Sequence, residues 1–186
     1  PDGYTLVFAP QSTLTINPSV YRKLPYDPVR DFEPVTQISS GAYMMVVHPS
    51  VPVRDVPSMI AAAKAAPGTI TFASGGGVGT PTHLAGELFK QIAGVDIVHV
   101  PYKGTAEQMI AVSSGQVMVG VNSSGFAPFV DNGQLRLLAT FGEQRTKRWP
   151  QVPTLKELGY GIVAISPYGL AGPAGMAPDI VRVLHD

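Results

Sequence analysis

The sequence contains 186 residues, of which 45% are hydrophobic, enough to bury the core of one or two compact units. Lysine plus arginine and aspartate plus glutamate number 13 each, and a formal net charge of +0 argues against nucleic acid as a partner. The absence of cysteine excludes disulfides, thiolate catalysis and cysteine-ligated zinc.

The first part of the chain predicts two strands separated by irregular structure. Residues 4–9 and 43–47 are short apolar runs bounded by proline, serine and glycine, which is typical of buried strands. The stretch 17–35 between them is rich in proline and turn-forming residues. We therefore expect an ordered loop with at most a short helix there.

From Val53 onward, helical and strand patterns alternate. The predicted helices cover 56–66, 81–94, 105–115 and 124–133, and the predicted strands cover 69–73, 96–100, 116–121 and 135–140. Glycine, or proline followed by glycine, falls where each of these helices should end. Such alternation predicts a parallel sheet covered by helices on both faces.

The last part of the chain predicts fewer regular elements. Residues 145–159 are polar and contain proline, with room for a short helix. Residues 161–175 are expected to form an extended crossing segment, and a final helix is expected from Pro178.

A glycine-rich segment, SGGGVGTPTH at residues 74–83, joins a predicted strand to a predicted helix. It lacks the lysine of a P-loop and the G-x-G-x-x-G spacing of a dinucleotide fingerprint, so a nucleotide-binding domain is disfavoured. Glycines allow close backbone approach, and the helix beginning near Pro81 presents the positive end of its dipole. The segment therefore predicts an anion site with Thr80 as the helix N-cap, the alternative being a capped helix without a ligand.

Two further strand exits add small polar residues to the same sheet edge. VPYKGT at 100–105 and VNSS at 121–124 each follow a predicted strand, and the carboxyl ends of parallel strands meet at one edge. No carboxylate is placed among these loops before Glu107. The resulting crevice predicts a small anion, most simply a carboxylate, held by neutral donors and helix dipoles.

Histidines raise catalytic and metal-binding alternatives. His83 and Glu87 stand four residues apart, but there is no H-E-x-x-H motif, and a third ligand would have to come from His99 or Asp96. There is no G-x-S-x-G elbow, although a Ser–His–Asp triad needs no closeness in sequence. We expect no metal and no cofactor, and we keep as an alternative an α/β enzyme acting on a carboxylate or phosphorylated metabolite, with His83 as the base.

Several motifs resemble those of one family. GGGVGTPTHLAGELFKQIAG at 75–94, VHVPYKGTAEQMI at 98–110 and the PQVPTLKELGY stretch at 150–160 keep the order found in Bug-type receptors. These are the periplasmic substrate-binding proteins of tripartite tricarboxylate transporters, and the resemblance runs through almost the whole chain. It implies an α/β, type II periplasmic-binding-protein-like fold of two lobes with a ligand cleft between them.

The resemblance also implies a division of the chain. Residues 1–43 would belong to the first lobe, 44–165 would form a second α/β lobe with the carboxylate-binding loops, and 166–186 would make the return crossing and a first-lobe helix. The family's usual first strand and ligand-contacting loop ahead of Gly3 are absent from this sequence, as is the far carboxyl-terminal part. Parts of the first lobe are therefore expected to lie outside it.

By the same resemblance, the protein would be a periplasmic receptor without enzymatic activity. It would bind a small organic acid, whether a dicarboxylate, an amino acid or an aromatic carboxylate, by hinge closure of the lobes, and deliver it to the membrane components of a tripartite transporter. We expect a monomer that binds no nucleic acid. The candidate ligand-binding residues are Ser74, Gly77, Gly79, Thr80, Thr82 and His83 in the glycine loop; Tyr102, Lys103, Gly104 and Thr105 in the next loop; Asn122 and Ser123 after the third strand; and Ser12, Thr13 and Tyr168 elsewhere.

Overall fold

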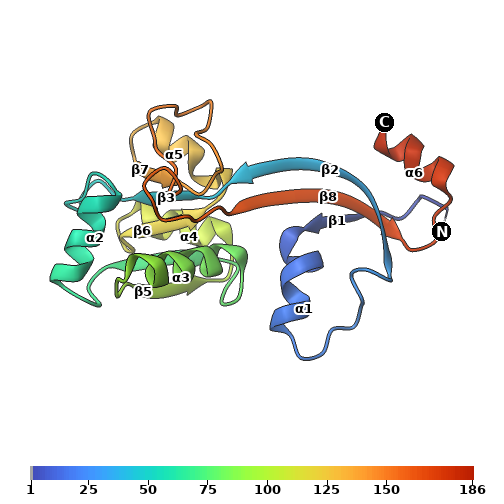
Figure 1. Ribbon diagram of the computed structural model, residues 1–186, viewed down its shortest axis with the longest axis horizontal. Helices are drawn as coiled ribbons and strands as arrows, with labels where there is room; N and C mark the ends of the chain where they lie inside the picture. The colour runs from blue at the N-terminus through green and yellow to red at the C-terminus, as the bar shows by residue number, and fades with distance from the viewer. Residues whose placement is uncertain (1) are drawn as a thin grey trace. The chain divides into compact units, whose positions relative to one another are not determined.

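The computed structural model describes residues 2–186, and its chain divides into two compact units. Unit 1 comprises Pro1–Ser40 and Ser166–Asp186, and unit 2 comprises Gly41–Ile165. The chain therefore passes between the units twice, near the end of strand β2 (Phe32–Ala42) and at the start of strand β8 (Ile165–Pro173) (Figure 1). Within the described residues, every helix falls short of the length and apolar character that a bilayer crossing demands.

Unit 1 is built on a small sheet in the order β1-β8-β2, with β1 (Val7–Pro10) antiparallel to β8. Its helical segments are η1 (Ser12–Ile16), α1 (Asn17–Val20) and α6 (Pro178–His185). The strand predicted at 4–9 is present as β1, but its expected burial was wrong, because Phe8 is 57% exposed. Strand β2 was also missed, since its sequence FEPVTQISSGA carries Pro34, which an edge strand tolerates.

Unit 2 contains a five-stranded sheet in the order β5-β4-β6-β3-β7. The strands are β3 (Met44–Val47), β4 (Thr71–Gly75), β5 (Val98–Tyr102), β6 (Val119–Asn122) and β7 (Arg136–Thr140). Strand β4 runs parallel to β5 and β6, whereas β3 runs antiparallel to β6 and β7. The predicted all-parallel sheet is therefore corrected to a mixed one, because an apolar run such as MMVV signals burial but carries no direction.

Helices cover both faces of this sheet, and the side chains of β3 alternate between them. Met45 and Val47 pack in the core that includes α2 (Val56–Ala65) and α3 (Pro81–Ala93). Met44 and Val46 pack on the opposite side with α4 (Thr105–Ser113). The sheet that carries the three predicted loops is thus packed against helices on both faces (Figure 1).

The predicted helices and strands of unit 2 lie within a few residues of their expected positions. The predicted helix at 124–133 is divided into η2 (Ser124–Phe126) and α5 (Ala127–Asp131). Gly94 ends α3 in the left-handed conformation, with φ 61°, as its sequence position indicates. The short helix expected within 145–159 is replaced by turns, where one bond from the Leu158 amide to the Thr154 carbonyl closes a single turn.

Candidate functional site

Three loops meet at the carboxyl edge of the parallel strands of unit 2. Strands β4, β5 and β6 end at Gly75, Tyr102 and Asn122. We call the loop ends that follow them, residues 76–80, 103–104 and 123, the glycine-loop edge. A Cβ on Gly75 would lie only 3.2 Å from the backbone nitrogen of Thr105, so the first turn of α4 packs directly against the end of β4.

The glycine loop has a backbone that side chains would strain. Gly76, Gly77 and Gly79 have φ of 89°, 87° and 83°, a region that L residues rarely adopt. Two hydroxyls hold this shape: Thr80 donates to the Gly77 carbonyl at 2.8 Å, and Thr82 donates to the Gly75 carbonyl at 3.1 Å. Each hydroxyl has a single proton and donates it to a carbonyl of the loop. Both threonines therefore stabilise the loop conformation.

The helices that begin at this edge have N-termini without side-chain caps. Thr80 occupies the N-cap position of α3 as expected, but its hydroxyl bonds back into the loop and caps nothing. Gly104 is the N-cap of α4 and has no side chain to offer. The N–H groups in the first turns of both helices, other than at Pro81, which has none, therefore stay uncovered by side chains, and two positive dipole ends lie at one edge.

Two histidines lie against each other beneath the loop. The Gly79 amide donates to Nδ1 of His83 at 3.1 Å, and the His83 and His99 rings lie 4.1 Å apart between centroids. Nε2 of His99 is bonded to the Ser74 hydroxyl at 2.6 Å. Burial, followed by the nearby His83, lowers the pKa of His99 to about 4, so His99 is neutral at neutral pH.

The position of Ser74 differs from the one expected for a ligand contact. Its side chain is fully buried, and its hydroxyl is occupied by His99. Ser74 therefore supports the loop from within the unit.

Sequence reasoning missed Gln108, a fully buried side chain on α4. Its amide nitrogen donates to the carbonyls of Ala73 at 2.8 Å and Val121 at 2.9 Å, and its oxygen accepts from the Asn122 amide. Gln108 thus ties β4 to β6 just below the glycine-loop edge. The available signal was its spacing, three residues before Ala111 on the buried face of the helix.

The other candidates of unit 2 lie at the same edge with differing exposure. Tyr102 is half-buried against the α4 core, whereas Lys103 and Thr105 are exposed. Asn122 is buried and accepts the Ser123 amide at 2.7 Å through its side-chain oxygen. The structure therefore brings together the backbone of all three loops, but it turns the side chain of Asn122 toward internal partners.

The remaining candidates belong to unit 1. Ser12 and Thr13 begin η1, and the Thr13 carbonyl accepts from the Tyr26 hydroxyl at 2.8 Å. Tyr168 lies on β8 and stacks on Phe8, with ring centroids 5.3 Å apart. Their assignment to a ligand stays a prediction.

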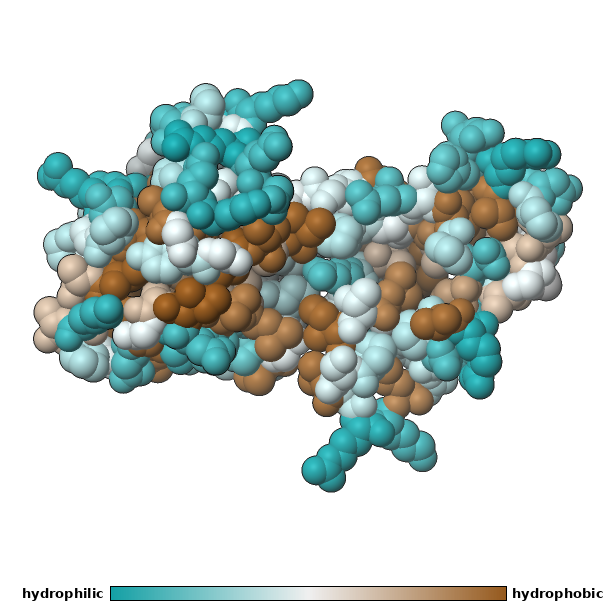
Figure 2. Space-filling view, viewed as in Figure 1, coloured by the Kyte–Doolittle hydropathy of each residue, from teal (hydrophilic) through white to brown (hydrophobic). Residues whose placement is uncertain are grey.

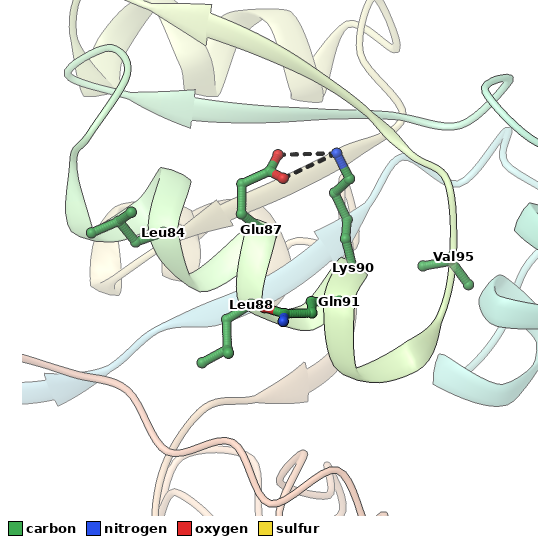
Figure 3. Close-up of a pocket in the computed structure, with 6 residues that line it drawn as sticks. All are labelled: Leu84, Glu87, Leu88, Lys90, Gln91 and Val95. Carbon is green, nitrogen blue, oxygen red and sulfur yellow. Dashed lines mark hydrogen bonds and ion pairs between the residues drawn. The ribbon is translucent and has the colours of Figure 1, made fainter.

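A surface hollow of about 500 Å³ lies along α3, and its lining includes none of residues 76–80. Figure 3 shows its lining: Leu84, Glu87, Leu88, Lys90, Gln91 and Val95. Glu87 and Lys90 pair at 3.1 Å, and Leu84 and Leu88 are 42% and 41% exposed. Figure 2 shows hydrophobic side chains gathered over this part of unit 2. With its charges paired, the hollow offers an anion little attraction.

The alternative of a metal site gains no support from the geometry. Among residues 2–186, no group of three or more histidine, cysteine, aspartate or glutamate side chains is arranged to hold a metal ion. His83 has Nε2 3.9 Å from a Glu87 oxygen, and this pair lacks a third ligand within the described chain.

Comparison with known proteins gives a consistent result. The model of the tripartite tricarboxylate transporter family receptor matches residues 1–186. The UPF0065 protein in the gbd 5' region of Cupriavidus necator is 43% identical over 187 residues, which cover 100% of this chain and 56% of that protein. BugT of Bordetella pertussis is 32% identical, with 99% of this chain and 57% of BugT covered. The chain thus spans little more than half the length of these relatives.

Solved structures show the same likeness. A Rhodopseudomonas palustris protein with adipate superposes with a TM-score of 0.91 at 32% identity, over 98% of this chain and 62% of that one. The periplasmic binding protein BugD gives 0.87 at 26% identity, over 99% of this chain and 62% of BugD. MatC from Rhodopseudomonas palustris with bound malate gives 0.85 at 25% identity, over 99% of this chain and 63% of MatC. The fold is that of the type II periplasmic binding proteins.

Proposed function

Because this chain belongs to the tripartite tricarboxylate transporter receptor family, we propose that unit 2 binds a carboxylate group of a small organic acid at the glycine-loop edge and leaves the acid chemically unchanged. Family members are periplasmic solute receptors. Two of the similar structures hold adipate and malate, both small acids with carboxylate groups. Those ligands support the class of ligand proposed here and leave its identity open among dicarboxylates, amino acids and aromatic acids.

The observation that carries the proposal is the pair of helix N-termini at one sheet edge. Neither α3 nor α4 has a side-chain cap, so their first N–H groups are available to an anion. The loop between β4 and α3 contains neither aspartate nor glutamate, and its three left-handed glycines leave the backbone open to close approach. Neutral donors and helix dipoles bind a carboxylate without needing a paired cation.

The alternative of an enzyme with His83 as the base is less well supported. Nδ1 of His83 already accepts the Gly79 amide, and Nε2 faces Glu87 at 3.9 Å. Both nitrogens are therefore directed to partners within unit 2, which suits a structural role better than proton abstraction.

Further parts of the proposal concern the whole protein. We propose that it works in the periplasm and delivers its acid to the membrane components of a tripartite transporter. We also propose that Ser12, Thr13 and Tyr168 of unit 1 contribute to recognition of the acid. These statements extend from the family to a chain that covers 56% of its relative from Cupriavidus necator.

A thermal-shift screen of the full-length protein tests the proposal. Organic acids that include adipate and malate, amino acids and nucleotides are each added in excess, and each mixture is then analysed for conversion. A ligand present at about 100 times its dissociation constant adds about 2.7 kcal/mol to the free energy of unfolding. Stabilisation by one class of carboxylate without conversion supports the receptor; conversion would favour the enzyme, and a response to nucleotides alone would refute the carboxylate site.

A further inference from the structure

The glycine loop depends on a side-chain acceptor that can take up a proton. The Gly79 amide donates to Nδ1 of His83 at 3.1 Å. This bond requires a lone pair on Nδ1, so the proton of the neutral ring resides on Nε2. Nε2 in turn lies 3.9 Å from an oxygen of Glu87.

The groups around His83 come from three elements. On α3, Glu87 faces Nε2 and is itself paired with Lys90 at 3.1 Å. On β5, the His99 ring lies 4.1 Å away, and on β4 the Ser74 hydroxyl holds the Nε2 atom of His99. Glu87 is therefore the anion placed to accompany a positive charge on His83.

Protonation of His83 would convert the acceptor into a donor. An N–H on Nδ1 would point at the Gly79 N–H across 3.1 Å, so the hydrogen bond is lost and Gly79 must turn away. The hydroxyl bonds of Thr80 and Thr82 do not depend on this proton and keep the rest of the loop in place. The rearrangement is therefore confined to the end of the loop next to α3.

Of the two stacked rings, only His83 takes up a proton in this change. Burial, with His83 as the next contribution, lowers the pKa of His99 to about 4, while Glu87 opposes that shift. Above that pH the His99 ring remains neutral, so it adds no second charge beside His83.

We propose that His83 is a pH-sensitive latch of the glycine loop, whose protonation releases Gly79 and weakens binding of the acid. The effect on binding rests on the proposed function; the latch itself does not. The charge gained by His83 adds little attraction for the acid because Glu87 faces it, whereas release of Gly79 loosens the backbone that orients the neighbouring N–H groups of the loop.

The latch is tested on the full-length protein without ligand, by following the Gly79 amide and the His83 ring with nuclear magnetic resonance between about pH 8 and about pH 6. The Gly79 resonance should shift, and its amide should exchange faster, with the same midpoint as the ring. His83→Asn is the matched variant, because its side-chain oxygen replaces Nδ1 as an acceptor that does not titrate. The latch would be refuted if the Gly79 amide resonance stayed unchanged while the ring titrates, or if it changed equally in His83→Asn.

The coupling to ligand is measured by calorimetry with adipate over the same pH range. The wild-type protein should bind adipate about tenfold more weakly at the lower pH, the effect of losing roughly one hydrogen bond, whereas His83→Asn should show no such dependence. Affinity that stays constant or rises on acidification overturns the coupling. If adipate fails to bind at either pH, adipate is excluded as the ligand of the proposed function, and the resonance experiment alone decides the latch.

Discussion

Thr80 shows how one side chain can serve the loop and, through it, a ligand. Its hydroxyl donates to the Gly77 carbonyl at 2.8 Å, so Thr80→Ala frees that carbonyl and loosens the backbone that faces the acid. We expect affinity to fall about tenfold, which corresponds to about 1.4 kcal/mol for one lost hydrogen bond. Calorimetry with the acid found by the screen measures this, and Thr80→Ser, which keeps the hydroxyl, should retain most of the affinity. Unchanged affinity with a lower unfolding temperature would reduce Thr80 to a structural role.

Two glycines of the neighbouring loops provide a contrast in backbone strain. Gly77 has φ 87° and Gly104 has φ −141°, and neither would place an added Cβ within 4 Å of another group. Gly77→Ala should therefore cost roughly 1 kcal/mol of unfolding free energy through its dihedral alone, whereas Gly104→Ala should be close to neutral. Urea denaturation of both variants compares them, and equal losses would contradict the strain argument.

His99 predicts a dependence of stability on pH. Its pKa is about 4 in the folded protein against 6.5 for an ordinary histidine, so between these values the unfolded chain binds more protons. The contribution of His99 to the free energy of unfolding is therefore complete above 6.5 and declines as the pH falls toward 4. His99→Gln keeps a group able to bond to Ser74 but cannot titrate, so its stability should fall less over this window. Identical slopes of stability against pH in the two proteins would contradict this prediction.

At the scale of elements, Gln108 joins α4 to the strands beneath the glycine-loop edge. Gln108→Met keeps the volume but leaves the carbonyls of Ala73 and Val121 without its donor, at roughly 1–3 kcal/mol for each unsatisfied group. We expect a clear drop in the midpoint of thermal unfolding. Gln91→Met places the same side chain on the exposed surface of α3 and should be close to neutral. Equal effects at the two sites would show that the hydrogen bonds of Gln108 add no stability.

The helices and strands also show how much of the fold could be predicted from the sequence alone. The order of helices and strands in unit 2 was predicted because apolar spacing and helix-ending glycines agree with each other. The direction of β3 was not predicted, because the direction of a strand depends on partner strands that are distant in sequence. Gln108 was missed because a buried glutamine and a surface glutamine look alike in a helix. The loop at 74–83 was predicted, but the internal bonding of its two threonines was not.

At the scale of the whole molecule, the two units differ in how the chain builds them. Unit 2 is continuous in sequence, whereas unit 1 is assembled from the two ends of the chain. The hydrogen bonds that hold the glycine loop and Gln108 join residues of unit 2 to one another. The identity of the acid is expected to depend on residues beyond these loops, since the loops offer backbone N–H groups that suit any carboxylate.

The central claim is that the glycine-loop edge of unit 2 binds a carboxylate through backbone donors. The most direct measurement is a nuclear magnetic resonance titration of the isotope-labelled, full-length protein with the acid that stabilises it most. The amides of residues 76–80, 82–83 and 104–106 should show the largest changes and should saturate at the same acid concentration. Changes confined to other parts of the chain, with these amides unaffected at saturation, would contradict the account.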